Sequence, residues 1–320
     1  MPYRSRLSRL LLRSLLGGCA LASCGVAGAA TVAGMYEAVV PPPSRDERAP
    51  ALTVALRQVA VRASGMRAAE RIDDRVEWQL REVRPDGTVR IGFDRVTVEK
   101  LLVKHNLPIW GRERPATLVW MRGGDGQWLS ASSSGPERDA IERVAQARGL
   151  PLIWPAMDAA DLDFAASLAP GRSASQLMAG AARYRADAVL VGVANEAGGM
   201  QFSFAYDEVV TGQAGSLEDS VHLAADRCAK ALAVPANARA DVNVRVSGVT
   251  GLDAYARTLN YFEDLSIVRA VSIERLQADV IDIRLDVRGD AGVLRKTIAI
   301  DRRLAADAAA DGALVYRVQN

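Results

Sequence analysis

Apolar residues recur along this chain in two different periods, and the alternation between these periods limits the folds that the chain can adopt. Every second residue is apolar in residues 76–80 and again in residues 89–93, which is the period of a strand with one buried face. The turn residues Pro85-Asp86-Gly87 separate these segments, so we expect a hairpin. Elsewhere apolar residues recur three or four positions apart, as in helices. Mixing the two periods predicts an α+β chain with mixed sheets and packed helices.

The same patterns divide most of the chain into elements. The run at residues 188–193 is apolar throughout, which is typical of a strand covered on both faces. Ser173 and Gln176 have the spacing of a capping box at a helix start. Strands are predicted at residues 35–40, 76–80, 89–93, 116–121, 150–154, 188–193 and 200–206, and helices at residues 46–64, 96–104, 136–149, 173–184 and 216–233.

The last part of the chain is predicted to form a separate unit after a linker at residues 235–240. Strands are predicted at residues 242–246, 267–273 and 281–287, and helices at residues 252–265 and 291–298. This βαββα order suits a small sheet with helices on one face. We therefore expect a main α/β domain at residues 31–235 and a small domain at residues 241–320. The main domain has an alternative division into subdomains at residues 31–115 and 116–235.

The first thirty residues have the features of an export signal. Arg4, Arg6, Arg9 and Arg13 precede an apolar run at residues 14–26, and small residues follow at 27–30. A basic start, a short apolar core and small residues at a cleavage site are typical of a signal peptide. The apolar run is too short to span a bilayer comfortably. The sequence therefore predicts cleavage after Ala29 or Ala30, release into the periplasm, and no transmembrane helix afterwards.

A competing signal lies in the same stretch. Leu21-Ala22-Ser23-Cys24 resembles a lipobox, the motif at which bacterial lipoproteins are cleaved and acylated. Lipidation at Cys24 would make the chain an outer-membrane lipoprotein with a lipid anchor. Residues 25–34 are more apolar than a typical lipoprotein tether, so soluble export is the favoured interpretation, with lipidation as its alternative.

Charge and cysteine content exclude further classes. The chain has 40 Lys+Arg and 38 Asp+Glu, and its arginines are spread among acids rather than gathered, so no nucleic-acid partner is predicted. After signal cleavage Cys228 is the only cysteine, so no internal disulfide can form. Cys228 lies on the apolar face of its helix and is expected to be buried.

Five segments resemble the bacterial domain of unknown function family 2066. They are YEAVVP at residues 36–41, LPIWGRERPATLVW at 107–120, RGLPL at 148–152, RYRADAVLVG at 183–192 and VSGV at 246–249. The resemblance implies an exported proteobacterial protein and carries no catalytic residues. The middle region is also similar, more loosely, to the N-terminal domain of the translocation protein TolB and to lipoprotein activators of penicillin-binding proteins. That similarity implies a TolB-N-like central α/β domain and partners in the cell envelope.

Catalytic motifs are absent from the sequence. His105 and His222 are the only histidines, and the chain has no H-E-x-x-H, G-x-S-x-G or phosphate-loop motif. We therefore predict no catalytic residue and no cofactor. His105 is expected at a helix end and His222 at the surface.

The most suggestive polar cluster contains Asp158, Asp161 and Asp163, just after a predicted strand. Ligands often bind at this end of strands, and several carboxylates can hold Ca²⁺ or Mg²⁺. The spacing differs from that of an EF-hand, and Asp158 or Asp161 would equally serve as a helix N-cap. The helix cap is the favoured interpretation, and a metal site is the alternative.

Tryptophans with neighbouring arginines are the weak candidates for a binding surface. Trp110 and Trp154 flank prolines in predicted loops, and Arg112 and Arg114 follow Trp110. Tryptophan and arginine are enriched at interface hot spots. The favoured interpretation is nevertheless a structural role, with Trp110 packed over a sheet edge and Arg112 or Arg114 paired with a carboxylate, and the binding surface is the alternative. Trp78 and Trp120 are expected in the core.

Together these patterns predict a non-catalytic accessory or scaffold that binds other envelope proteins. Two alternatives remain open: a hydrolase or metal-dependent enzyme with a carboxylate site near Asp158, and a small-ligand or lipid-binding module.

Overall fold

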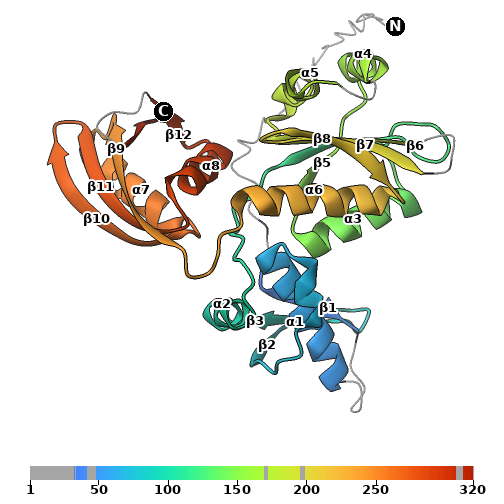
Figure 1. The fold of residues 1–320 in the computed structure, drawn as a ribbon, viewed down its shortest axis with the longest axis horizontal. Coiled ribbons are helices and arrows are strands. Elements are labelled where there is room, and N and C mark those ends of the chain that lie inside the picture. Colours follow the sequence, from blue (N-terminus) through green and yellow to red (C-terminus); the bar gives the residue numbers. More distant parts are fainter. Residues whose placement is uncertain are drawn as a thin grey trace, which may run out of the picture.

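The computed structural model describes residues 32, 34–41, 48–168, 172–194, 199–307 and 313–319. The predicted signal peptide, with Cys24 and the cleavage sites at Ala29 and Ala30, lies outside these residues. Helices pack on three separate sheets (Figure 1), which confirms the predicted α+β class. Within the described ranges, no helix is both long and apolar enough to cross a membrane.

The first unit, residues 34–104, is built on a three-stranded antiparallel sheet of order β1-β3-β2. Its elements are β1 (Glu37–Val40), α1 (Arg48–Ser64), a 3-10 turn (Arg67–Arg71), β2 (Trp78–Val83), β3 (Val89–Phe93) and α2 (Arg95–Lys104). Ile91 and Phe93 of β3 pack against Val59 of α1 and Leu102 of α2. The predicted hairpin is present as β2 and β3, and β2 forms one edge of the sheet.

The central unit, residues 117–232, has a five-stranded mixed sheet of order β5-β4-β6-β7-β8. Its strands are β4 (Thr117–Met121), β5 (Leu152–Ile153), β6 (Ala188–Ala194), β7 (Met200–Ala205) and β8 (Val209–Ala214), and its helices are α3 (Pro136–Arg148), α4 (Ala159–Ser167), α5 (Ala174–Ala179), a 3-10 turn (Ala182–Tyr184) and α6 (Leu217–Leu232). Helices α3 and α6 cover one face, and α4 and α5 lie over the other (Figure 1). This double cover explains why β6 is apolar throughout.

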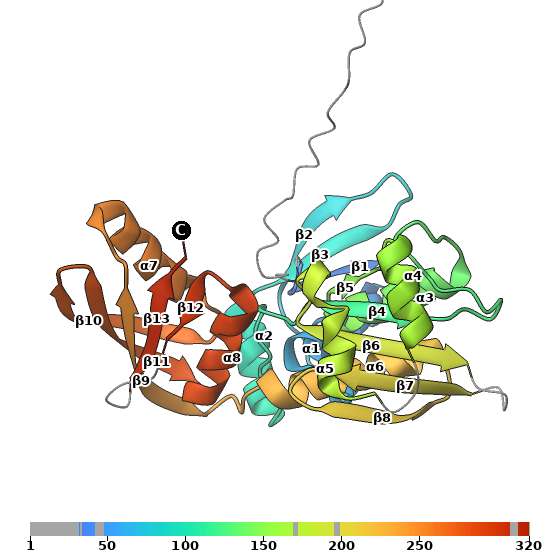
Figure 2. The ribbon, with the colours of Figure 1, turned by 90° about the horizontal axis from the view of Figure 1, so that it is seen from above.

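The C-terminal unit, residues 239–318, has a five-stranded sheet of order β10-β11-β9-β13-β12. Its elements are β9 (Arg239–Ser247), α7 (Gly251–Asp264), β10 (Val268–Gln277), β11 (Val280–Arg288), α8 (Ala291–Asp301), β12 (Leu304–Ala306) and β13 (Leu314–Val318). The predicted βαββα order is present, but two strands follow it. β13 pairs parallel to β9 and lies inside the sheet. The unit stands beside the other two (Figure 2).

Buried arginines join the first and central units at the C-terminal ends of α1 and α3. Arg114 Nη2 donates to the carbonyl of Arg62 at 2.8 Å, and Arg62 Nε donates to that of Gln146 at 3.1 Å. The last carbonyls of a helix have no intrahelical donor, so cations there satisfy them and oppose the helix dipole. Gly149 ends α3 with a φ of 65°, and an added Cβ there would lie 2.7 Å from Arg62 Cγ. Glycine therefore permits this close junction.

Candidate functional site

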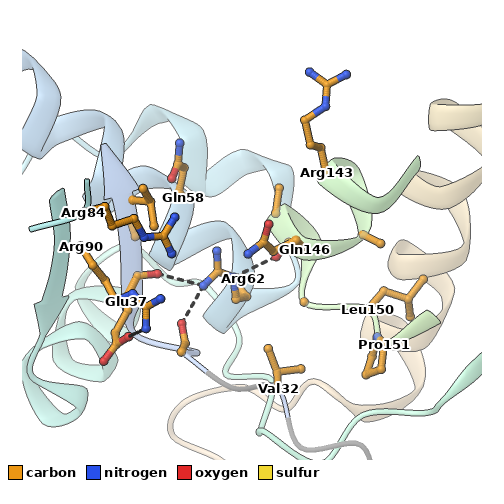
Figure 3. Close-up of a pocket in the computed structure, with 16 residues that line it drawn as sticks. Val32, Glu37, Gln58, Arg62, Arg84, Arg90, Arg143, Gln146, Leu150 and Pro151 are labelled. Atoms are coloured by element: carbon orange, nitrogen blue, oxygen red, sulfur yellow. Dashed lines mark hydrogen bonds and ion pairs between the residues drawn. The ribbon is translucent and has the colours of Figure 1, made fainter. Parts of the chain in front are cut away.

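A cavity of about 710 Å³ lies between the first unit and the C-terminal end of α3 (Figure 3). One side is formed by β1, α1 and the β2–β3 hairpin. The other side is formed by α3 and the segment that follows it, including Ala145, Ala147, Leu150 and Pro151. This volume lies within the range of pockets that hold small molecules.

The charges that line the cavity are strongly unequal. Four arginines contribute to it, and Glu37 is the only carboxylate among its lining residues. Figure 3 shows Arg62, Arg84 and Arg90 gathered near Glu37, whereas Arg143 extends from α3 away from them. Guanidinium groups bind carboxylates and phosphates through paired hydrogen bonds, so this arginine-lined cavity suits an anion.

Arg62 is held firmly by backbone carbonyls. It is 7% exposed, and its Nη1 donates to the carbonyls of Gly34 at 2.8 Å and Glu37 at 2.9 Å. Burial lowers the pKa of the Arg62 guanidinium, and the charge of Glu37 partly offsets this effect. None of the described residues accepts a hydrogen bond from Nη2 of Arg62. One donor of a buried, fixed guanidinium is thus left for a ligand or water.

The carboxylates near these arginines neutralise them only partly. Glu37 Oε2 lies 3.8 Å from Arg90 Nη1, and Glu82 Oε2 lies 3.8 Å from Arg84 Nε and 3.3 Å from Arg90 Nε. The 3.8 Å separations exceed hydrogen-bond distance, so these contacts are weak ion pairs in a partly exposed setting. Arg84 and Arg90 therefore retain donors that can bind a further anion.

Sequence reasoning did not single out these arginines, although one signal was present. Val59 and Ala63 lie on the predicted apolar face of the first helix, and Arg62 lies within one turn of both. A cation on an apolar helix face indicates a buried charge with a specific role. Arg84 and Arg90 flank a turn, which gives no comparable signal.

A second distinctive surface is the edge strand β2. All six of its residues are exposed, and no strand in the described part of the chain pairs with its outer edge. Trp78, Leu80 and Val83 are 39%, 55% and 64% exposed. They lie opposite Phe93, Ile91 and Val89, so they share the face of the sheet that packs on the helices. The prediction that Trp78 is a core residue is therefore wrong, because β2 extends beyond the helices that cover β3.

The structure corrects the expectation of a Trp110 and Arg114 binding loop. Trp110 is 1% exposed and Arg114 is fully buried, with the Arg114 guanidinium carbon 3.4 Å from the Trp110 ring centroid. Arg114 donates to the carbonyls of Gly111, Trp110 and Arg62. Burial lowers its pKa well below the usual value. The structural role describes Trp110 correctly, and of the two arginines it is Arg112 that pairs with a carboxylate, that of Glu113, whereas Arg114 binds carbonyls.

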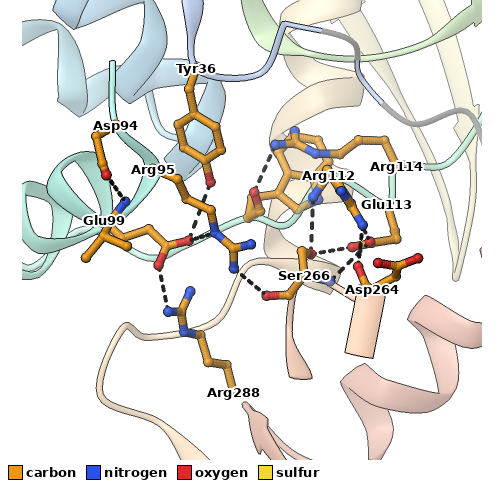
Figure 4. Close-up of polar contacts among 12 residues, drawn as sticks. Tyr36, Asp94, Arg95, Glu99, Arg112, Glu113, Arg114, Asp264, Ser266 and Arg288 are labelled. Carbon is orange, nitrogen blue, oxygen red and sulfur yellow. Dashed lines mark hydrogen bonds and ion pairs between the residues drawn. The ribbon is translucent and has the colours of Figure 1, made fainter. Parts of the chain in front are cut away.

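Arg112 belongs to a polar network that attaches the C-terminal unit (Figure 4). Its Nε lies 3.3 Å from Glu113 Oε1, and its Nη2 donates to the carbonyl of Asp264. The hydroxyl of Ser266 donates to Glu113, and the backbone amide of Ser266 also donates to Glu113 at 3.2 Å. Arg112 is the exposed member of the predicted set, and its contacts are within the chain.

Glu99 of α2 carries the other half of this network. It accepts hydrogen bonds from Arg95 at 2.8 Å and from Arg288 of β11 at 2.6 Å (Figure 4). Burial alone would raise the pKa of Glu99, but the bonds from Arg288 and Arg95 outweigh it and hold the pKa below its usual value. The first and C-terminal units are thus joined by charged groups.

Trp154 is also largely buried, at 9% exposure. Its indole N–H donates to Glu142 at 3.0 Å, and Arg138 lies over its ring at 5.1 Å from the centroid. This packing on α3 corrects the expectation that Trp154 belongs to an exposed binding surface.

The aspartate cluster is occupied by protein contacts. Asp158 caps α4 by accepting from the amide of Asp161, which agrees with the favoured interpretation. Arg183 donates to both Asp158 and Asp161, and its hydrogen bond lowers the pKa of Asp158. Asp161 also accepts from the hydroxyl of Tyr184, while Asp163 is exposed on α4. The described residues contain no group of three His, Cys, Asp or Glu side chains that could hold a metal ion.

The remaining titratable candidates lie as follows. His105 is the C-cap of α2, as expected, and its Nε2 lies 2.5 Å from Asp74 Oδ2. His222 is half-buried beside Arg148, and burial lowers its pKa, so the prediction of a surface histidine is only partly right. Cys228 is fully buried, as predicted, and burial raises the pKa of its thiol.

The sequence matches no protein-family model, no curated protein and no solved structure. The resemblance to family 2066 and the looser similarity to the TolB N-terminal domain therefore stay predictions from sequence.

Proposed function

We propose that this chain is a non-catalytic accessory or scaffold of the bacterial cell envelope that acts by binding another protein. The proposal includes export through residues 1–30, release into the periplasm with lipidation at Cys24 as the alternative, and membership of family 2066. These parts rest on the sequence patterns described above. The choice of binding over catalysis rests on the surface of β2.

The exposed edge of β2 is the observation that carries the proposal. Edge strands are usually short, charged or covered, because unpaired backbone groups attract other strands. β2 carries the charged Arg81 and Glu82 and a bulge after Leu80, but it also places three apolar side chains, Trp78, Leu80 and Val83, beside an edge with which no described strand pairs. Burying half of such a side chain contributes about 1 kcal/mol, roughly half of the value for full burial. An extended partner segment would gain this contribution as well as backbone hydrogen bonds.

The chemistry of the partner follows from this geometry. A strand that pairs with β2 presents its side chains alternately to the two faces of the sheet. Residues on the helix-covered face would contact Trp78, Leu80 and Val83, so they should be apolar. Residues on the other face would meet Gln79, Arg81 and Glu82, so polar or charged side chains are favoured there. We expect an extended segment that alternates apolar and polar or charged residues.

The carboxylate-site alternative has less support than protein binding. A hydrolase near Asp158 would need carboxylates that can hold water or metal. Arg183 and Tyr184 already bind the oxygens of Asp158 and Asp161. The ligand-binding alternative is favoured by the arginine-lined cavity and is developed below.

The test is co-purification from the bacteria that produce the protein. An affinity-tagged chain is compared with the double variant Leu80→Asp/Val83→Asp and with the control Leu252→Asp, whose leucine is 80% exposed on α7. We expect a protein that co-purifies with the parent and the control but not with the β2 variant. Recovery of the same proteins with all three would contradict the proposal. Sedimentation of the purified parent, the β2 variant and the control adds one more outcome. If the parent and the control are dimers and the β2 variant is a monomer, the partner of β2 is a second copy of this chain and not another envelope protein.

A further inference from the structure

We propose that the cavity between the first unit and α3 binds a small organic anion, with its carboxylate or phosphate head at Arg62, Arg84 and Arg90. The cavity shares the β2–β3 hairpin with the partner surface but uses other residues of it: Arg84 and Arg90 line the cavity, whereas the apolar residues of the partner surface are Trp78, Leu80 and Val83.

The anion preference follows first from Arg62. Its guanidinium is fixed by the carbonyls of Gly34 and Glu37 at the start of β1 and by that of Gln146 in α3. A side chain held in this way loses little conformational entropy when it binds a ligand. Because its Nη2 has no acceptor among the described residues, a bound anion would complete its hydrogen bonds.

Arg84 and Arg90 supply the second part of the site. They come from the β2–β3 hairpin and lie on the same side of the cavity as Arg62 (Figure 3). Their ion pairs with Glu82 and Glu37 leave most of their donors unused. Three arginines near two carboxylates leave an excess of positive charge, which an added anion would neutralise.

The opposite wall determines the rest of the ligand. Ala145, Ala147, Leu150 and Pro151 give this wall an apolar surface, and Gln146 and Arg143 of α3 add its polar side chains. A ligand that fills the cavity therefore needs an apolar part to contact this wall. The chemistry of the site points to an amphiphilic anion rather than to an inorganic ion.

Three probes separate the contributions of head and body. 1-Naphthyl phosphate has both, inorganic phosphate has only the head, and 1-naphthol has only the apolar body. Binding is measured by calorimetry at pH 7.5 and low salt, where the phosphate monoester is mostly dianionic. We expect 1-naphthyl phosphate to bind at least about tenfold more tightly than either fragment. 1-Naphthoate, measured in parallel, tells whether a carboxylate or a phosphate is the preferred head.

Variants test whether the binding belongs to this cavity. Arg84→Gln/Arg90→Gln should weaken 1-naphthyl phosphate binding by about tenfold or more, since each variant side chain loses charge-assisted hydrogen bonds. The control Arg295→Gln removes an exposed arginine of α8 that does not line the cavity, and should leave binding unchanged. Ala147→Phe should fill the apolar side and weaken 1-naphthyl phosphate while phosphate binding persists. This second variant keeps the test valid if the double variant does not fold.

The outcomes decide the proposal. Equal binding of 1-naphthyl phosphate by the parent and both cavity variants would overturn it. It would also be overturned if Arg295→Gln weakened this binding as much as the cavity variants do. Absence of binding by 1-naphthyl phosphate and 1-naphthoate to the parent would also overturn it.

Discussion

Replacement of Arg114 by methionine tests most sharply how the units of this chain are held together. Arg114 is fully buried, and among the residues that the structure describes no carboxylate accepts its hydrogen bonds. Its three shorter hydrogen bonds go to the carbonyls of Gly111, Trp110 and Arg62, the last of these in the final turn of α1, and a longer one of 3.5 Å goes to that of Gly149. Methionine preserves much of the volume but removes every donor. The change therefore isolates the hydrogen bonds from the packing.

The expected loss can be worked from these three bonds. A buried carbonyl left without a donor costs about 1–3 kcal/mol, and partial entry of water reduces the sum. We expect Arg114→Met to lower the free energy of unfolding by about 3–5 kcal/mol, the range found when one partner of a buried charged contact is removed. That is a large part of the stability of an ordinary domain, which is about 5–15 kcal/mol.

The assay is urea unfolding followed by tryptophan fluorescence, since Trp110 lies directly against Arg114. Arg112→Met is the matched control from the same loop, where the side chain is 46% exposed. The control should cost about 1 kcal/mol or less, as for other exposed ion pairs. A loss below about 1 kcal/mol for Arg114→Met, or equal losses for the two variants, would refute the structural role of Arg114.

Three further predictions follow from the other sites. The hydrogen bonds of Glu99 hold its pKa below the usual 4.5, so its contribution to stability is present above that pH and is lost as the pH falls through the lower value. The free energy of unfolding should therefore fall more steeply with decreasing pH for the parent than for Glu99→Gln. The same dependence on pH in both proteins would argue against this contribution. Thermal melts with and without a chelator should coincide, because Arg183 occupies Asp158 and Asp161; a fall of several degrees with chelator would favour the metal-site alternative. Cys24→Ala should leave processing and solubility unchanged if the chain is cleaved near Ala29, whereas an uncleaved variant and a fatty-acid-labelled parent would show lipidation instead.

Strong periodicity made several elements predictable. The continuous apolar run of β6 and the alternating β3 gave the correct strands, since burial on two faces or one leaves a clear pattern. The capping box at Ser173 marked the start of α5 correctly. The helix predicted to follow it ends early at Ala179, and a 3-10 turn replaces its second half.

Other elements gave too weak a signal. β8 contains Thr211, Gly212 and Gln213 at the edge of the central sheet, where little burial is needed and no alternation develops. β12 has three residues and β13 has five, so neither is long enough to establish a period. β13 nevertheless pairs with β9, about seventy residues earlier in the chain. Local sequence patterns do not indicate which distant segments will pair.

The candidate site was harder to predict than the fold. Tryptophan with arginine indicated an interface at Trp110 and Arg114, but the same composition also suits a buried arginine that caps a helix. The burial of Arg114 distinguishes an exposed interface from a buried helix cap, and amino-acid composition does not reveal burial. Arg62, Arg84 and Arg90 come together only because α1 and the hairpin pack side by side.

Photo-crosslinking from β2 in living cells tests the central claim most directly. A photoreactive amino acid at position 80 replaces Leu80, and the same group at position 295 on α8 is the control. If β2 is the docking edge, one envelope protein is captured from position 80 and not from position 295. The captured site then lies in a segment that alternates apolar and polar residues. Capture of no protein from position 80, or equal capture from position 295, would contradict the claim that β2 is the docking edge.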